Sequence, residues 1–141
     1  TGCLVPQDIR SMTAQTTSFH GDLAFEASYI SPDEAIGTMA VKAGLLNPFG
    51  TVHAGAMIWF ADVVATTLAL QGRTPTAGMQ GFPLAITLSA NLLANCREGH
   101  LHAQARFVKK GRRVSTVRTK VTSDEGKVLR DLTTTHVVAE G

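Results

Sequence analysis

The sequence predicts an α+β domain in which a curved antiparallel β-sheet is wrapped around one long helix. Residues 53–70 run without a proline and repeat apolar side chains at helical spacing. Later in the chain, four extended segments alternate with glycine-containing turns at hairpin-like spacing. A sheet with one wet face has to bury its other face, and the single long helix can cover it.

The segments before the long helix predict one short helix and one hairpin. Residues 5–19 begin with Val-Pro-Gln-Asp and place apolar side chains at irregular helical spacing, which favours a short, weakly amphipathic helix. Between residues 23 and 41, two runs rich in Phe, Tyr, Ile, Thr and Val flank a Ser-Pro-Asp-Glu sequence. That composition is typical of two strands joined by a turn. A loop over residues 44–50 follows.

The long helix is predicted from a single apolar stripe. Gly72 and Pro75 mark its end, and further glycines keep the chain in a loop as far as Phe82. The stripe consists of Met57, Phe60, Ala61, Val64 and Leu68.

Four strands are expected after that loop. In the third, Arg118 and Lys120 alternate with Val117 and Val121, which is the pattern of a strand with one wet face. The four extended segments are residues 82–95, 100–109, 113–122 and 127–139.

Length and composition narrow the possible functions. A chain of 141 residues fits one domain, residues 1–141, and a net charge of +2 is too weak to suggest nucleic-acid binding. The apolar stretches are broken within about 10 residues, far short of the ~20 needed to cross a bilayer, so no membrane association is expected. Two cysteines and the lack of a basic-then-apolar leader favour a cytoplasmic protein. No spacing of Cys, His and Asp suggests a metal site.

Asp62 is a carboxylate within the most apolar helix of the chain. Burying it without partners would cost several kcal/mol. No Lys or Arg lies within one helical turn of it, so it does not resemble one half of a surface salt bridge. The residue pattern leaves two interpretations open, a functional acid and an exposed or hydrogen-bonded structural one.

The residues at the start of the helix predict a site for a carbonyl or an anion. The backbone N–H groups of Ala54 and Gly55 have no helical acceptor and lie at the positive end of the helix dipole. Small side chains let a substrate approach these donors closely, as an oxyanion hole requires. Tight packing of Ala-Gly against the sheet is the alternative. His53 is interpreted as an orienting residue rather than a base.

The segment Asn47-Pro-Phe-Gly-Thr-Val-His-Ala-Gly, followed by Phe60-Ala61-Asp62, closely resembles the signature of hotdog-fold acyl-CoA thioesterases of the PaaI type. It is also similar to 4-hydroxybenzoyl-CoA thioesterases that carry their carboxylate on the central helix. The match joins an Asn before a turn, a His, a small pair at the helix start and an acid nine residues after the His. The resemblance implies a hotdog fold and hydrolysis of a small or medium acyl- or aryl-CoA to the free acid and CoA.

The resemblance also implies roles for individual residues. Asp62 becomes the nucleophile or general base and Ala54 the N–H donor to the thioester carbonyl, with Gly55 beside it. Asn47 positions water or substrate, and His53 orients the loop. Thr66 matches an auxiliary hydroxyl of some relatives, and Thr87 is assigned as a substrate contact.

There are two departures from the family pattern. The family usually has Gly-Gly where this chain has Ala54-Gly55, so a methyl group is added near the thioester. Some relatives place a Ser or Asp on the strand after the helix, where this chain has Ala85 and Thr87.

The family binds coenzyme A at a subunit boundary, where basic residues meet its phosphates. The resemblance therefore implies a homodimer or homotetramer with the active site at the interface, and no metal or redox cofactor. A run of basic residues in this chain could bind those phosphates through charge-assisted hydrogen bonds. A solvated hairpin tip is the alternative interpretation of this basic run. Its residues are Lys109, Lys110, Arg112 and Arg113.

Three other functions stay open. One is a non-catalytic acyl-CoA-binding module of the same fold, which would lack the acid that Asp62 provides. Another is a hydratase or dehydratase of the fold, which typically has a Pro-Gly before the helix that this chain lacks. The last is a protein-interaction scaffold, which would turn over no thioester.

Overall fold

The computed structural model describes residues 16, 18 and 20–139. Its elements are six strands, one α-helix and one short 3-10 helix. In chain order they are β1 (Glu26–Ser31), β2 (Glu34–Ala40), η1 (Ala43–Leu45), α2 (Ala54–Ala69), β3 (Pro83–Leu92), β4 (His100–Lys109), β5 (Val114–Thr122) and β6 (Val128–Val138).

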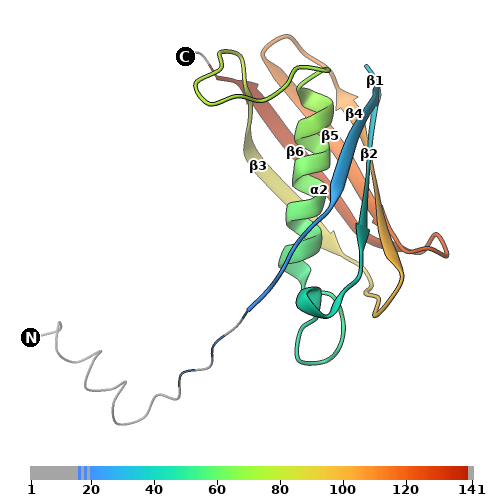
Figure 1. Ribbon diagram of the computed structural model, residues 1–141. Coiled ribbons are helices and arrows are strands. Elements are labelled where there is room, and N and C mark those ends of the chain that lie inside the picture. Colours follow the sequence, from blue (N-terminus) through green and yellow to red (C-terminus); the bar gives the residue numbers. More distant parts are fainter. Residues whose placement is uncertain (1–15, 17, 19, 140–141) are drawn as a thin grey trace, which may run out of the picture.

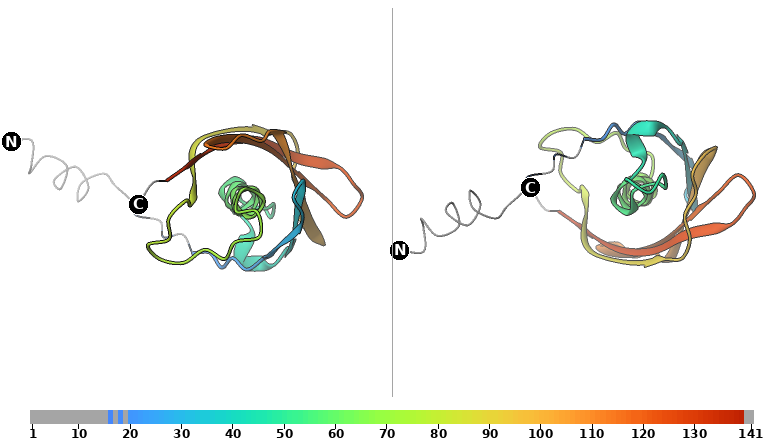
Figure 2. Two further views of the ribbon diagram at one scale, coloured as in Figure 1. Left: turned by 90° about the horizontal axis from the view of Figure 1, so that it is seen from above. Right: turned by 90° about the horizontal axis from the view of Figure 1, so that it is seen from below.

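The strands form one antiparallel sheet in the order β1-β2-β4-β5-β6-β3. The sheet curves around α2, which runs along its concave face (Figure 1). Viewed along the helix, the strands enclose α2 on most sides (Figure 2). This is the predicted curved antiparallel sheet around one long helix, so the expected fold class is confirmed.

The core lies between α2 and the concave face of the sheet. All five residues of the predicted stripe are buried, and Phe60 and Met57 are among the largest fully buried side chains. Each such side chain contributes about 1.5–3 kcal/mol by leaving water. Gly37 on β2 lets the helix approach closely, because an added Cβ would lie 2.5 Å from a methyl of Val64 and 2.9 Å from the Phe60 ring.

The predicted hairpin at 23–41, the long helix and the four later strands are confirmed with small shifts of their ends. The structure adds η1, which the sequence did not suggest, in the loop after β2. The helix expected over 5–19 lies outside the described residues, apart from residues 16 and 18. In the part of the chain that the structure describes, no helix is long and apolar enough to cross a bilayer.

Strand β3 lies at one edge of the sheet and pairs only with β6. A bulge between Ala85 and Thr87 changes which face its side chains occupy. Ala85 pairs with the buried His136, whereas Thr87 pairs with the next residue, Thr135. Because directly paired side chains share a face and successive side chains alternate, Ala85 faces inward and Thr87 outward.

Candidate active site

The start of α2 presents two backbone donors. His53 is the N-cap, and its side chain makes no capping hydrogen bond. The first bonds of the helix are those from Ala56 and Met57 to the His53 carbonyl, and the described residues provide no acceptor for the N–H groups of Ala54 and Gly55. An added Cβ on Gly55 would meet nothing within 4 Å. Within one chain, the space beside the Gly55 Cα is therefore open.

Asn47 organises the loop that leads to the helix. Its Oδ1 accepts hydrogen bonds from the N–H groups of Phe49 at 2.9 Å and Thr51 at 3.1 Å, and its Nδ2 donates to Thr51 Oγ1 at 2.8 Å. Such self-bonding is typical of Asx turns. Both polar ends of the Asn47 side chain are thus engaged within the loop, and its predicted contact with water or substrate stays a prediction.

Asp62 is half-buried in the middle of α2. Its Oδ1 is fully buried, and no hydrogen-bond donor reaches it among the described residues. A buried acceptor without a donor costs about 1–3 kcal/mol, and more if it is charged. Within one chain, Asp62 Oδ1 therefore lacks the hydrogen bond that a structural role would supply, and the functional role of Asp62 stays a prediction. Thr66, also half-buried, follows one helical turn later.

A buried histidine lies within the electrostatic reach of Asp62. His136 on β6 is bonded to Thr134 Oγ1 at 2.8 Å and to the Pro83 carbonyl at 3.3 Å. Burial lowers the pKa of His136, while the bond to Pro83 and the negative charge of Asp62 oppose that shift. The imidazole is therefore held neutral over a wider pH range than in water.

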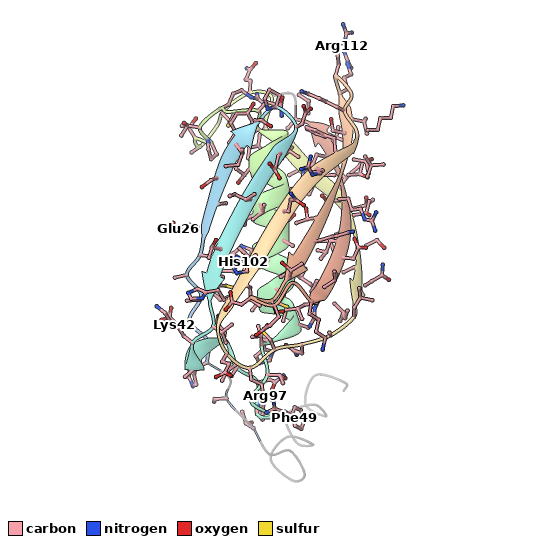
Figure 3. The ribbon with its side chains drawn as sticks, turned by 90° about the vertical axis from the view of Figure 1, so that its right-hand side faces the viewer. Glu26, Lys42, Phe49, Arg97, His102 and Arg112 are labelled. Carbon is pink, nitrogen blue, oxygen red and sulfur yellow. The ribbon has the colours of Figure 1, made fainter. Side chains whose placement is uncertain are left out.

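A cavity of about 150 Å³ lies at the opposite end of α2 from Ala54. It contains three of the four predicted basic residues, Lys110, Arg112 and Arg113, but not Lys109. Arg112 extends from the β4–β5 hairpin, at the far end of the molecule from Phe49 and Arg97 (Figure 3). The hairpin needs glycine at 111, because a Cβ there would lie 2.2 Å from the Val114 carbonyl oxygen.

Other residues that the sequence alone does not connect with the basic run also line this cavity. Among them are Arg73, from the loop after α2, Ser115 from β5, and the buried His136. Arg73 is held by a bond from its Nε to the Leu70 carbonyl at 3.0 Å. The cavity thus combines a fourth arginine or lysine with a hydroxyl, which are groups that bind phosphate.

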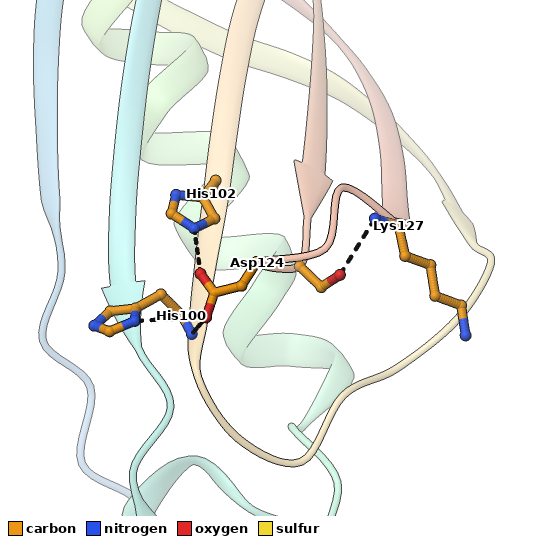
Figure 4. A network of polar contacts seen from close by, with 5 residues as sticks. His100, His102, Asp124 and Lys127 are labelled. Carbon is orange, nitrogen blue, oxygen red and sulfur yellow. Dashed lines mark hydrogen bonds and ion pairs between the residues drawn. The ribbon is translucent and has the colours of Figure 1, made fainter.

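A separate group of titratable side chains lies on the outer face of β4. Asp124 Oδ1 is 2.7 Å from His102 Nε2, and Asp124 Oδ2 accepts the His100 N–H at 3.0 Å (Figure 4). The bond to His102 lowers the pKa of Asp124 most, followed by the bond from His100. Within residues 20–139 no three metal-ligating side chains converge well enough to hold an ion.

The model of the thioesterase superfamily matches residues 49–130, more than half of the sequence. The chain belongs to the thioesterase superfamily. The matched region includes the start of α2, Asp62 and the basic hairpin. Thioester hydrolysis is therefore the reaction class of this enzyme, as the sequence predicted. No curated protein matches the chain.

Solved structures share the fold. A thioesterase from Haemophilus influenzae is 22% identical over 84% of this chain and 80% of its own, with a TM-score of 0.74. A mutant thioesterase from Pseudomonas aeruginosa is 23% identical over 84% of each chain, also at 0.74. A hypothetical thioesterase protein from Streptococcus pneumoniae with coenzyme A is 18% identical over 88% of this chain and 95% of its own, at 0.73. The fold of this thioesterase is the hotdog fold.

Proposed function

We propose that this thioesterase hydrolyses small or medium acyl- or aryl-CoA thioesters to the free acid and CoA, in the manner of the PaaI type. The observation that carries the proposal is the buried, partnerless Oδ1 of Asp62. A carboxylate held without donors is poised to act as a nucleophile or a general base. The S. pneumoniae structure with coenzyme A supports CoA as the thiol part of the substrate.

In the proposed reaction, the Ala54 N–H donates to the thioester oxygen, and Asp62 either attacks the carbonyl carbon or removes a proton from an attacking water. Negative charge develops on the thioester oxygen and is stabilised by that N–H and by the helix dipole. The C–S bond then breaks, CoA leaves as the thiolate and is protonated, and water supplies the oxygen and protons of the products.

One chain does not bring these two groups together. Ala54 and Asp62 are eight residues apart on one helix, which at ~1.5 Å per residue is about 12 Å. Reacting atoms must come within about 3–3.5 Å. We therefore propose that Ala54 from one subunit meets Asp62 from another across a two-fold interface.

The free edge of β3 supports self-association. Leu84, Ile86, Leu88 and Leu92 on this strand are each more than two-fifths exposed, and a long apolar edge without a partner strand is prone to pairing. A second copy pairing there would bury these side chains. We propose a homodimer as the minimal active unit, with a tetramer as the alternative. The cytoplasm is the proposed location, on the cysteine content alone.

The basic cavity is the proposed site for the phosphates of CoA. Asp62 and Ala69, which lines the cavity, are seven residues apart on α2, about 10 Å along the axis. An extended pantetheine arm from a thioester at Asp62 is long enough to carry the phosphates to that end of the helix. Lys110, Arg112 and Arg113 would then bind the phosphates with Arg73.

The test is a panel of short, medium, branched and aromatic acyl-CoAs, with released thiol measured by a dye. We expect turnover of at least one class, and Asp62→Asn should lower it by at least about a hundredfold, the scale of losing a general base. The variant should fold, because the amide can replace the carboxylate in shape. No turnover by the wild type would exclude the proposal, and an active Asp62→Asn would exclude the assigned role.

A further inference from the structure

Arg130 is a buried cation that the proposed mechanism does not use. It lies on the inner face of β6 and is only 3% exposed. Its Nη1 donates to the Leu129 carbonyl at 2.9 Å and to the Ala94 carbonyl. No described carboxylate pairs with it, and burial lowers its pKa. A buried arginine without a counter-ion is costly, so its position calls for a reason beyond packing.

The bond to Ala94 connects Arg130 with the strap, which we define as residues 93–97 between β3 and β4. The N–H groups of Leu93 and Ala94 both donate to the Leu129 carbonyl, at 2.9 and 3.2 Å. The Arg130 guanidinium donates to this same carbonyl and also to the Ala94 carbonyl of the strap. Arg130 therefore connects β6 with the strap at the point where the chain leaves β3. Charge-assisted bonds of this kind are stronger than neutral ones.

The other end of the strap holds the residues just before α2. Asn95 Nδ2 donates to the Val52 carbonyl at 3.0 Å, and the Val52 N–H donates to the Cys96 carbonyl at 3.1 Å. Arg97 Nη1 donates to the Phe49 carbonyl at 3.2 Å, and these two residues lie side by side at this end of the molecule (Figure 3). The strap thus supports residues 49–52 from one side.

Val52 and His53 determine where α2 begins. Val52 is fully buried, and the His53 N–H donates to the Leu45 carbonyl at 2.9 Å. The next residue is Ala54, whose N–H has no acceptor among the described residues. A displacement of Val52 therefore moves this donor directly, and displacements of about 1 Å at a reacting group can cost a hundredfold in rate.

We propose that Arg130 is a positioning residue for the thioesterase reaction, which through the strap fixes residues 51–53 and hence the Ala54 N–H. The inference rests on the role of Ala54 in the proposed function. Arg130 touches no reacting atom. Its guanidinium bonds carbonyls of β6 and of the strap, and the strap in turn bonds Val52, so the three segments keep one geometry.

The test compares Arg130→Met with Arg130→Lys, Asn95→Ala and, as a matched control, Arg118→Met. Arg118 lies on the outer face of β5 and is bonded to Asp131, so its loss removes an arginine without affecting the strap. The readouts are kcat, KM, and backbone amide hydrogen exchange at residues 51–53, whose N–H groups are all hydrogen-bonded. The exchange measurement needs no activity.

We expect Arg130→Met to lower kcat about tenfold, to change KM less than about twofold, and to speed amide exchange at 51–53 more than in α2. Arg130→Lys should restore part of both effects, because an ammonium group still donates to carbonyls. Asn95→Ala should act similarly, and the double variant should cost less than the two single effects combined. Arg118→Met should change neither readout.

A folded Arg130→Met with unchanged kcat and unchanged exchange at 51–53 would overturn the inference. So would faster exchange spread evenly over the molecule, which is the signature of a purely structural role. If Arg130→Met does not fold, Asn95→Ala decides by the same readouts. If the amides at 51–53 loosen but kcat does not fall, Ala54 is not the donor, and the role assigned to Ala54 fails rather than the positioning.

Discussion

Replacing Ala54 by proline deletes one N–H group and little else. Ala54 is the first residue of α2, the position at which proline is well tolerated, because its missing N–H would have no helical acceptor. His53 already has φ −56° and ψ 133°, within the extended region that a following proline requires. The described residues lose no hydrogen bond. We therefore expect the free energy of unfolding to stay unchanged or to rise by about 0.4–1 kcal/mol.

Activity should respond in the opposite direction. Removing one oxyanion donor typically costs about 10²–10³ in kcat, or about 2.7–4 kcal/mol of transition-state stabilisation. The assay is release of CoA thiol at saturating substrate, with Ala54→Gly as the control that keeps the N–H and Ala54→Val as the control for bulk. If Ala54→Pro retains more than about a tenth of wild-type kcat, or if Ala54→Val is equally inactive, the N–H does not stabilise the oxyanion.

The same variant tests whether the site is shared between subunits. Ala54→Pro and Asp62→Asn are denatured together in equal amounts and refolded. Random pairing makes half the dimers mixed, and in a shared site each mixed dimer has one intact site and one with both lesions. Activity should recover to about a quarter of wild type if the sites are independent. Recovery no greater than the mean of the parents, with mixed dimers verified by mass spectrometry, would assign both residues to one chain's site.

Three further outcomes are expected. Reversing charge at Arg112 and Arg113 should raise KM for CoA esters far more than for short thioesters without the nucleotide; equal effects would remove the phosphate role. Gly55→Ala should stabilise the helix by about 0.5–1 kcal/mol, because an added Cβ meets nothing within 4 Å. The same variant should lower turnover, and unchanged turnover would mean that no substrate approaches the backbone at Gly55. Because burial lowers the pKa of His136 from 6.5, the unfolded state binds more protons below that pH. The free energy of unfolding should fall as pH drops below about 6.5, and His136→Asn should lack this slope in urea titrations at several pH values.

The helix and strands whose patterns lie within a short stretch of sequence were predictable. The apolar stripe of α2 and the glycine turns between strands depend on residues close together in the chain, and the structure confirms both. The absence of a Lys or Arg within one helical turn indicated that Asp62 has no local ion-pair partner, and its Oδ1 has no hydrogen-bond donor in the structure. The 3-10 helix η1 was missed because three residues without a cap carry no periodic pattern.

Features that depend on strand register were not predictable. Ala85 and Thr87 are two residues apart and should share a face, but the bulge between them separates them. Arg73 meets the basic hairpin only because the helix and the β4–β5 turn end on the same side of the sheet. Arg130 could have been found, since in an alternating strand it must share the inner face of Leu132, where a cation is unexpected.

The place of β3 in the sheet has a consequence for how the chain is made. Among the described strands its only partner is β6, which is synthesised after all the others. Until then, neither edge of β3 can pair within its own chain, although the strand is rich in Leu and Ile. Pairing over such a sequence separation is slow, and exposed apolar edges associate with other chains. During synthesis on one messenger, β3 of a neighbouring nascent chain is therefore available before β6, so the proposed dimer could begin to form while both chains are still being translated.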